Sequence, residues 1–150
     1  MMMALMVLHV CLLNLDEHYY NKKRQHSKYE IVSVITDGFL FLLPLLLATF
    51  VTFDEKWVIL YKTIAGISMV SVVKNELFYK GLEVQERFIH ACLYVLHPIL
   101  LFNFYESWKL NYFQSNYYFW MFQLVYVALG VKTVSYQLIY WNYIHDGTKK

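Results

Sequence analysis

Four long apolar segments constrain this chain more than any other feature of its sequence. They cover residues 31–53, 57–73, 88–105 and 117–141, and each contains very few charged side chains. A bilayer core about 30 Å thick is crossed by about 17–25 helical residues, and every one of these segments has such a length. Runs this long, without alternation of apolar and polar residues, predict membrane-spanning helices and not strands.

A fifth apolar segment, residues 1–15 from Met1 to Leu15, is marginal. It would form about 22 Å of helix, so it either crosses a locally thinned bilayer or lies at its interface. We favour a crossing, because one orientation of the chain then agrees with its charge pattern. No basic residues precede the segment and no small-residue cleavage site follows it, which argues against a removed signal peptide.

The basic residues are distributed unevenly among the predicted loops. With the N-terminus outside and about five crossings, the inner side receives Lys22, Lys23, Arg24, Lys28, Lys74, Lys80, Arg87, Lys149 and Lys150. Only Lys56 and Lys109 then lie outside, while Lys62 and Lys132 lie within the membrane. Short cytoplasmic loops are enriched in Lys and Arg. The sequence therefore predicts one all-α domain, residues 1–150, with a cytoplasmic C-terminus, in a cell or inner membrane.

The composition excludes several other classes of protein. Hydrophobic residues make up 59% of the chain and charged residues 16%, whereas soluble domains average about 45–50% and about 25%. A net charge of +2, spread over short loops, does not form the basic surface that nucleic-acid binding requires. The two cysteines, Cys11 and Cys92, lie in apolar segments without the paired spacing of a zinc or redox motif.

Ionisable residues inside the apolar segments are the candidates for function. Each costs about 2.5–3.5 kcal/mol to insert, and such groups usually face the bundle interior, where they find partners. At a rise of about 1.5 Å per residue, five of these groups gather at or below the bilayer centre: His9, Asp37, His90, His97 and Lys132. We therefore predict a polar pocket within the membrane that opens to the cytoplasm.

Helical periodicity adds neighbouring side chains to this pocket. At about 100° per residue, His90 and His97 fall within about 40° of a line that also passes Glu86. Each predicted helix offers one polar side in this way. Beside the five ionisable groups, the residues on these polar sides are Ser33, Asn75, Glu86, Tyr94 and Tyr136.

The leading functional expectation is a lipid-modifying or lipid-handling enzyme whose ligand is a lipid or another small molecule. His90 would act as acid or base, because an imidazole titrates near neutrality, and Glu86 would orient it. Lys132 would hold an anionic headgroup. His97 and Asp37 would tune or pair with these groups. No nucleotide-binding, hydrolase or di-iron motif narrows the reaction further.

Other interpretations of the same residues stay open. Glu86 and His90 are four positions apart and could reach one metal ion, with His9 or Asp37 as a third ligand. Because this is one of several alternatives, no metal site or cofactor is assigned. Stacked polar groups could also relay protons. Alternatively, the protein is non-catalytic, an accessory subunit or small transporter, and these residues hold helices together by hydrogen bonds. A homo-oligomer would suit a bundle this small.

Overall fold

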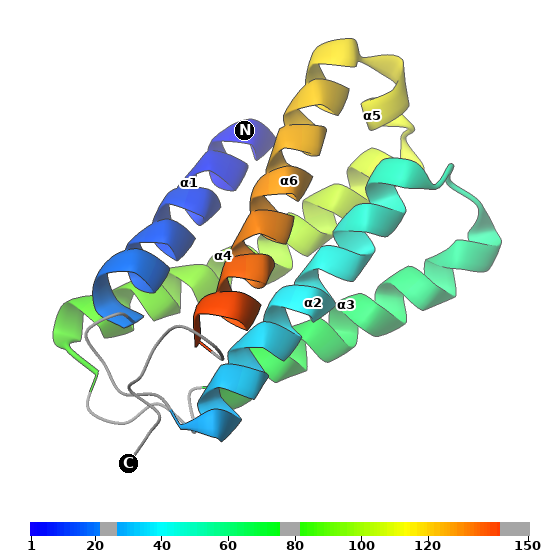
Figure 1. The fold of residues 1–150 in the computed structure, drawn as a ribbon. Helices are drawn as coiled ribbons and strands as arrows, with labels where there is room; N and C mark the ends of the chain where they lie inside the picture. The colour runs from blue at the N-terminus through cyan, green and yellow to red at the C-terminus, as the bar shows by residue number, and fades with distance from the viewer. Residues whose placement is uncertain (22–26, 76–81, 142–150) are drawn as a thin grey trace.

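The computed structural model is built from helices, as the sequence predicts. It describes residues 1–21, 27–75 and 82–141, and these residues contain no strand. The long helices are α1 (Met2–Leu15), α2 (Lys28–Phe50), α3 (Glu55–Asn75), α4 (Val84–Lys109) and α6 (Tyr117–Ile139). A π-helical turn, η1 (Asp16–Tyr20), continues α1, and the short α5 (Tyr112–Ser115) precedes α6. Figure 1 shows these helices packed side by side as a bundle.

Four of the helices, α2, α3, α4 and α6, are long and apolar enough to cross a membrane. They coincide with the four apolar segments, so these predictions are confirmed as helices. Large hydrophobic side chains lie on their outward faces, among them Val32, Ile59, Val70, Phe88, Val95 and Phe102. Such faces are typical of helices that contact lipid and not water.

Short-range hydrogen bonds set where several helices begin. Ser27 and Glu30 form a capping box at the start of α2, with each side chain accepting the other's backbone N–H at 3.2 and 3.3 Å. Asp54 accepts the Lys56 backbone N–H at 3.0 Å before α3, and hydrogen bonds from Lys56 lower the pKa of this carboxyl. Asn116 caps α6 in the same manner. The cap at Ser27 explains why α2 begins three residues earlier than predicted.

The first helix is longer than the sequence predicts. The apolar segments 1–15 and 31–53 predict a loop over residues 16–30, but η1 carries the helix from α1 on to Tyr20, and α2 begins at Lys28. In η1 the Asn21 backbone N–H bonds to the Asp16 carbonyl, five residues back, which is the π-helical spacing. The loop prediction is wrong for residues 16–20, because Asp16 and Glu17 find polar partners inside the bundle. It is also wrong for residues 28–30, because the Ser27 cap starts α2 at Lys28.

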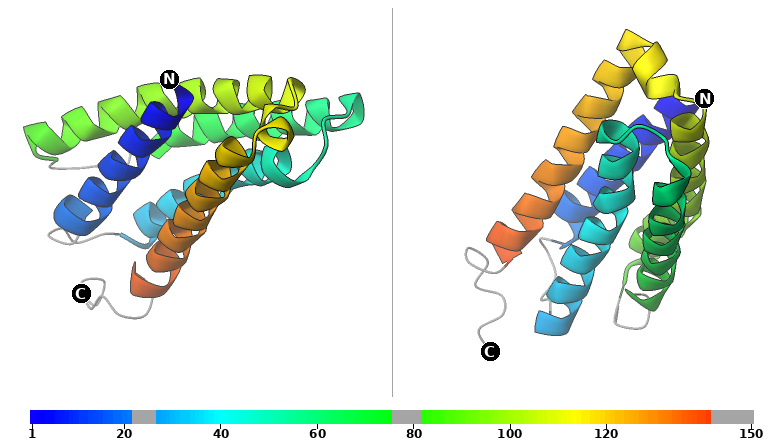
Figure 2. Two further views of the ribbon diagram at one scale, coloured as in Figure 1. Left: turned by 90° about the horizontal axis from the view of Figure 1, so that it is seen from above. Right: turned by 90° about the vertical axis from the view of Figure 1, so that its right-hand side faces the viewer.

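The antiparallel helices give the bundle two distinct ends. One end, here called the η1 end, holds η1, the beginnings of α2 and α4 and the ends of α3 and α6; the opposite α5 end holds α5 (Figures 1 and 2). Lys28, Lys74 and Arg87 lie at the η1 end, and Lys56 and Lys109 at the α5 end, grouped as predicted. The other basic residues of the predicted inner side, Lys22, Lys23, Arg24, Lys80, Lys149 and Lys150, lie outside the described residues.

Near the α5 end the interior is an apolar core. Leu45, Leu100 and Phe104 are buried there together with the aromatic residues Tyr61 and Trp108. The Tyr61 and Trp108 rings stack with centroids 5.6 Å apart. Each also donates a hydrogen bond to a backbone carbonyl, Tyr61 to Leu101 at 2.7 Å and Trp108 to Val51 at 2.6 Å. The buried carboxylates, in contrast, lie toward the η1 end: Asp16, Glu17, Glu30, Asp37 and Glu86.

Two glycines allow α2 and α6 to approach closely. A Cβ on Gly38 would lie 2.7 Å from Val134 Cγ2, and one on Gly130 would lie 2.9 Å from Leu42 Cδ1. Small residues at helix contacts are a common means of close packing in membranes. These two contacts set the face that α6 turns toward α2.

The substitution Gly38→Ala is expected to destabilise the protein by about 1–3 kcal/mol, the usual range for overpacking a well-packed interior. The matched control is Gly66→Ala, because a Cβ on Gly66 would meet nothing within 4 Å. Alanine should there be neutral or stabilising by about 0.5–1 kcal/mol, since it favours the helix. Unfolding in mixed detergent–SDS micelles measures both changes, and equal effects at the two positions would contradict the close contact.

Candidate functional site

A cavity of about 150 Å³ lies between α1, α2, α4 and α6, toward the η1 end. Its walls are largely apolar, with Phe41, Leu42, Leu93 and Leu129 among the residues that line them. Polar side chains from five elements, α1, η1, α2, α4 and α6, face into the same space. A mostly apolar cavity with a few convergent polar groups is the usual form of a small-molecule site.

Half of the sequence-predicted site residues line this cavity. They are His9 from α1, Asp37 from α2, and His90, Tyr94 and His97 from α4. His9, His90 and His97 are 4%, 4% and 6% exposed, and Asp37 is 8% exposed. The bundle thus brings together ionisable residues that are far apart in the sequence.

The remaining predicted residues lie elsewhere. Glu86 is buried beside His90, one helical turn away and outside the cavity lining. Ser33 is buried without lining the cavity. Tyr136 is half-buried, stacks on Tyr140 with centroids 4.9 Å apart and contacts His18 edge-on. Asn75 is the last residue of α3, and its side chain lies outside the described residues.

Lys132 departs from the sequence-based expectation. Its side chain is exposed and does not line the cavity, so the prediction that it faces the pocket and holds an anionic headgroup is wrong in this fold. The reason is the rotation of α6. Val134 and Gln137 face α2 at Gly38, and Lys132 lies well over 90° from both around a helix with about 100° per residue.

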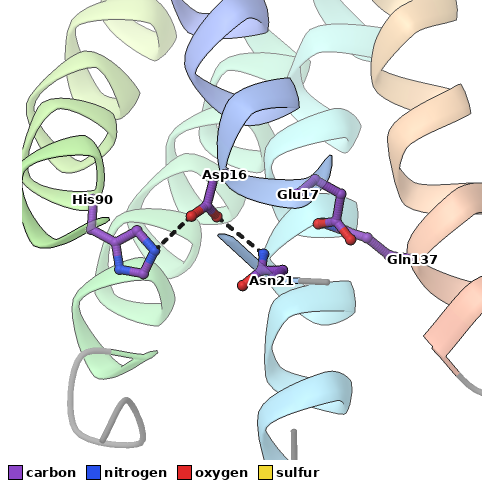
Figure 3. Close-up of polar contacts among 5 residues, drawn as sticks. All are labelled: Asp16, Glu17, Asn21, His90 and Gln137. Carbon is purple, nitrogen blue, oxygen red and sulfur yellow. Dashed lines mark hydrogen bonds and ion pairs between the residues drawn. The ribbon is translucent and has the colours of Figure 1, made fainter. Parts of the chain in front are cut away.

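Asp16 is a site residue that the sequence interpretation missed. Its Oδ1 lies 3.1 Å from His90 Nε2, and its Oδ2 accepts a hydrogen bond from Asn21 Nδ2 at 3.2 Å (Figure 3). One ligand atom each from Asp16, Glu86 and His90 lie within 4.8 Å of one another. A signal was present in the sequence, because seven residues separate Asp16 from His9 and would place both on one face of a helix extended past Leu15.

A second polar contact joins η1 to α6. Glu17 is 3% exposed, and its Oε2 accepts a hydrogen bond from Gln137 Nε2 at 2.9 Å. The indole N–H of Trp141 donates to the other carboxylate oxygen. Glu17 and Gln137 both line the cavity, on the side away from His90 (Figure 3). These contacts hold the π-helical turn against the end of α6.

The two histidines deeper in the cavity are already hydrogen-bonded between helices. His9 Nδ1 lies 2.7 Å from the Tyr126 hydroxyl, and His97 Nε2 lies 2.8 Å from the Ser68 hydroxyl. The Phe41 ring contacts both imidazoles, with centroid distances of 5.1 and 4.6 Å. The same apolar ring therefore packs against both imidazoles.

No protein-family model, curated protein or solved structure matches this chain. The fold and the site themselves define a class, an all-α bundle with four helices able to cross a membrane and a partly polar cavity between its helices. Candidate functions follow from the residues that line this cavity.

Proposed function

We propose that this chain is a multi-pass membrane protein that holds part of an amphiphilic, lipid-like molecule in the cavity between α1, α2, α4 and α6. The supporting observation is the cavity itself, whose apolar walls meet ionisable groups toward one end. An apolar ligand body with one polar end matches that distribution. The exposed hydrophobic faces of α2, α3, α4 and α6 favour entry of the ligand from a bilayer.

The proposed topology has about five crossings, with α1 and η1 together forming the first. A helix from Met2 to Tyr20 would extend about 28 Å, close to the bilayer core, which makes a crossing more favourable than for residues 1–15 alone. Lys28, Lys74 and Arg87 lie at the η1 end. Because Lys and Arg are enriched on the inner side, we assign the η1 end to the cytoplasm and the N-terminus to the outside.

The charges of the cavity suggest which polar group the ligand carries. Asp16, Glu17 and Asp37 contribute carboxylates to the lining, and no Lys or Arg belongs to the part of the lining that the structure describes. In a medium of low polarity such a site repels anions strongly. We therefore propose a ligand whose polar end is an amine or hydroxyl, in place of the anionic headgroup inferred from Lys132.

The volume limits how much of the ligand enters. A cavity of about 150 Å³ matches the engineered apolar cavities that bind one benzene molecule. It can hold a ring or a short stretch of alkyl chain against Phe41 and Leu129, while the rest of a lipid extends into the bilayer. If the bound molecule is chemically modified, His90 is the proposed acid or base, oriented by Asp16 at 3.1 Å.

One alternative has a specific observation in its favour. The His9–Tyr126 and His97–Ser68 hydrogen bonds each join two helices, and such bonds stabilise bundles in lipid. In a non-catalytic protein these histidines would serve only to hold the helices together. His90 differs from them, because its described partner is a carboxylate and not a hydroxyl group.

The binding test uses octylamine, octanol and octanoate, which share one alkyl chain and differ in the polar end. With the protein in nanodiscs, octylamine is expected to bind at least about tenfold, or about 1.4 kcal/mol, more tightly than octanoate. Asp37→Asn should reduce the preference for the amine over the alcohol, because it removes one carboxylate from the lining. Isothermal titration with empty nanodiscs as the reference measures these affinities.

Matched variants separate cavity binding from partition into the lipid. Leu129→Trp should weaken all three probes by filling the cavity, whereas Val131→Trp changes an exposed position on the same helix and should not. Lys132→Ala should leave the order of affinities unchanged, since Lys132 does not line the cavity. The proposal would be refuted if Leu129→Trp left the affinities of all three probes unchanged, or if the wild-type protein bound octanoate more tightly than octylamine.

A further inference from the structure

We propose that Asp16, Glu86 and His90 bind a divalent transition-metal ion at the edge of the cavity. Each residue offers one ligand atom, and the three atoms lie within 4.8 Å of one another. Glu86 and His90 are 3% and 4% exposed, and Asp16 is 9% exposed. Two carboxylate oxygens and one imidazole nitrogen form a mixed donor set of the kind found in metal sites with open coordination positions.

The distances suit a common ion. Ligand atoms at about 2.0–2.2 Å from a tetrahedral metal are separated by about 3.3–3.6 Å. His90 Nε2 and Asp16 Oδ1 are 3.1 Å apart, so an ion could replace the proton between them with little movement. Glu86 and His90 occupy positions i and i+4 of α4 and therefore share a helix face. One Glu86 carboxylate oxygen already lies within 4.8 Å of the other two ligand atoms, so a modest contraction would bring all three to one ion.

The surroundings of Asp16 support a ligand role. Asn21 donates to Oδ2 at 3.2 Å, leaving Oδ1 directed toward His90 (Figure 3). Carboxylates and histidines that bind metals are commonly oriented by such outer-shell hydrogen bonds. The π-helical turn that begins at Asp16 brings both Asp16 and Asn21 inward, and π-helical turns occur frequently at functional sites.

The donor set also indicates the class of ion. Imidazole favours ions such as Zn²⁺, Fe²⁺ or Co²⁺ over Mg²⁺ and Ca²⁺, which prefer oxygen ligands alone. Two carboxylates would balance the charge of a divalent ion, which lowers the cost of burying it. Asp16 and His90 line the cavity, so the remaining coordination positions would face it. With the ion bound, His90 would be a ligand and would not serve as the acid or base, while Asp37 and Glu17 would still present carboxylates to an amine.

This inference does not depend on the amphiphile proposal, because its test measures metal binding in the absence of any octyl probe. Protein without a histidine tag is treated with EDTA, dialysed in mild detergent and titrated separately with Zn²⁺, Co²⁺ and Mg²⁺. We expect one Zn²⁺ or Co²⁺ per chain by elemental analysis, visible absorption bands from bound Co²⁺, a raised Tm, and weak Mg²⁺ binding. Removal of the metal by EDTA should reverse the rise in Tm.

Variants on α4 assign the ion to this cluster. His90→Gln should weaken Zn²⁺ binding by more than the about 10–100-fold loss that an outer-shell change causes. Asn21→Ala removes an outer-shell hydrogen bond, so it should weaken Zn²⁺ binding by about 10–100-fold. His97→Gln is the matched control, because it removes another buried histidine of the same helix that lies outside the cluster, and it should retain the metal.

Several results would overturn the inference. One is a wild-type protein that retains no stoichiometric Zn²⁺ or Co²⁺. Another is binding that His90→Gln and Glu86→Gln leave unchanged, which would mean an adventitious ion only, held for example by the exposed His18. If His90→Gln does not fold, Glu86→Gln and the Co²⁺ spectrum of the wild-type protein decide, since surface binding would give the weak bands of a water-rich octahedral ion.

Discussion

Replacing Phe104 with alanine is expected to lower the free energy of unfolding by about 3–5 kcal/mol, the range for removal of a large buried ring. Phe104 is fully buried, and its ring lies against Tyr126 and Phe41 with centroids 5.8 and 6.3 Å away. For a bundle in lipid, as proposed here, the hydrophobic transfer term between helices is small, so the loss comes from dispersion contacts and from the space left behind. We therefore expect a value near the lower end of the range.

The same helix supplies the control for this substitution. Phe102 lies two residues away and is 65% exposed on the outer face of α4. Phe102→Ala should change the free energy of unfolding by less than about 0.5 kcal/mol, as surface substitutions usually do. SDS titration of both variants in mixed micelles, followed by circular dichroism, makes the comparison. Similar losses for the two variants would mean that α4 is rotated relative to this structure.

The helical architecture was predictable because it depends on short-range properties of the chain. Length and apolar composition alone located α2, α3, α4 and α6. The extension of α1 through η1 was not predictable in this way, since Asp16 and Glu17 look like loop residues until their partners are known. Those partners, His90 and Gln137, lie 74 and 120 residues away in the sequence. Helix packing brings these partners to Asp16 and Glu17, and their hydrogen bonds lower the cost of burying the two carboxylates.

The candidate site was predictable to a similar depth. Helical periodicity gives the relative angles of residues on one helix. Of the α4 residues that it placed on one face, His90, Tyr94 and His97 line the cavity and Glu86 does not. It does not give the rotation of that helix in the bundle. For α6 this rotation depends on close contacts at Gly38 and Gly130, which turn Lys132 outward. Asp16, the third candidate metal ligand, was missed because it belongs to η1, which was predicted to be part of a loop.

The substitution Gln137→Leu is expected to lower the free energy of unfolding by about 1.5–3 kcal/mol, the usual contribution of a hydrogen bond to a charged group. Gln137 Nε2 donates to Glu17 Oε2 at 2.9 Å, and both side chains are buried. Leucine is similar in size but offers no donor, so the Glu17 carboxylate loses one of its hydrogen bonds in a poorly solvated position. Thermal and SDS unfolding in the same detergent measure the change.

A double-mutant cycle shows whether this loss belongs to the carboxylate. Glu17→Met removes the acceptor, so Gln137→Leu should cost much less in that background, with a coupling energy of about 0.5–3 kcal/mol. Equal costs in both backgrounds would mean that Gln137 acts through packing against Gly38 instead. Zn²⁺ binding should persist in Gln137→Leu, because Gln137 contacts Glu17 and the proposed metal ligand on η1 is the preceding residue, Asp16. Loss of both properties together would imply that the whole π-helical turn depends on its attachment to α6.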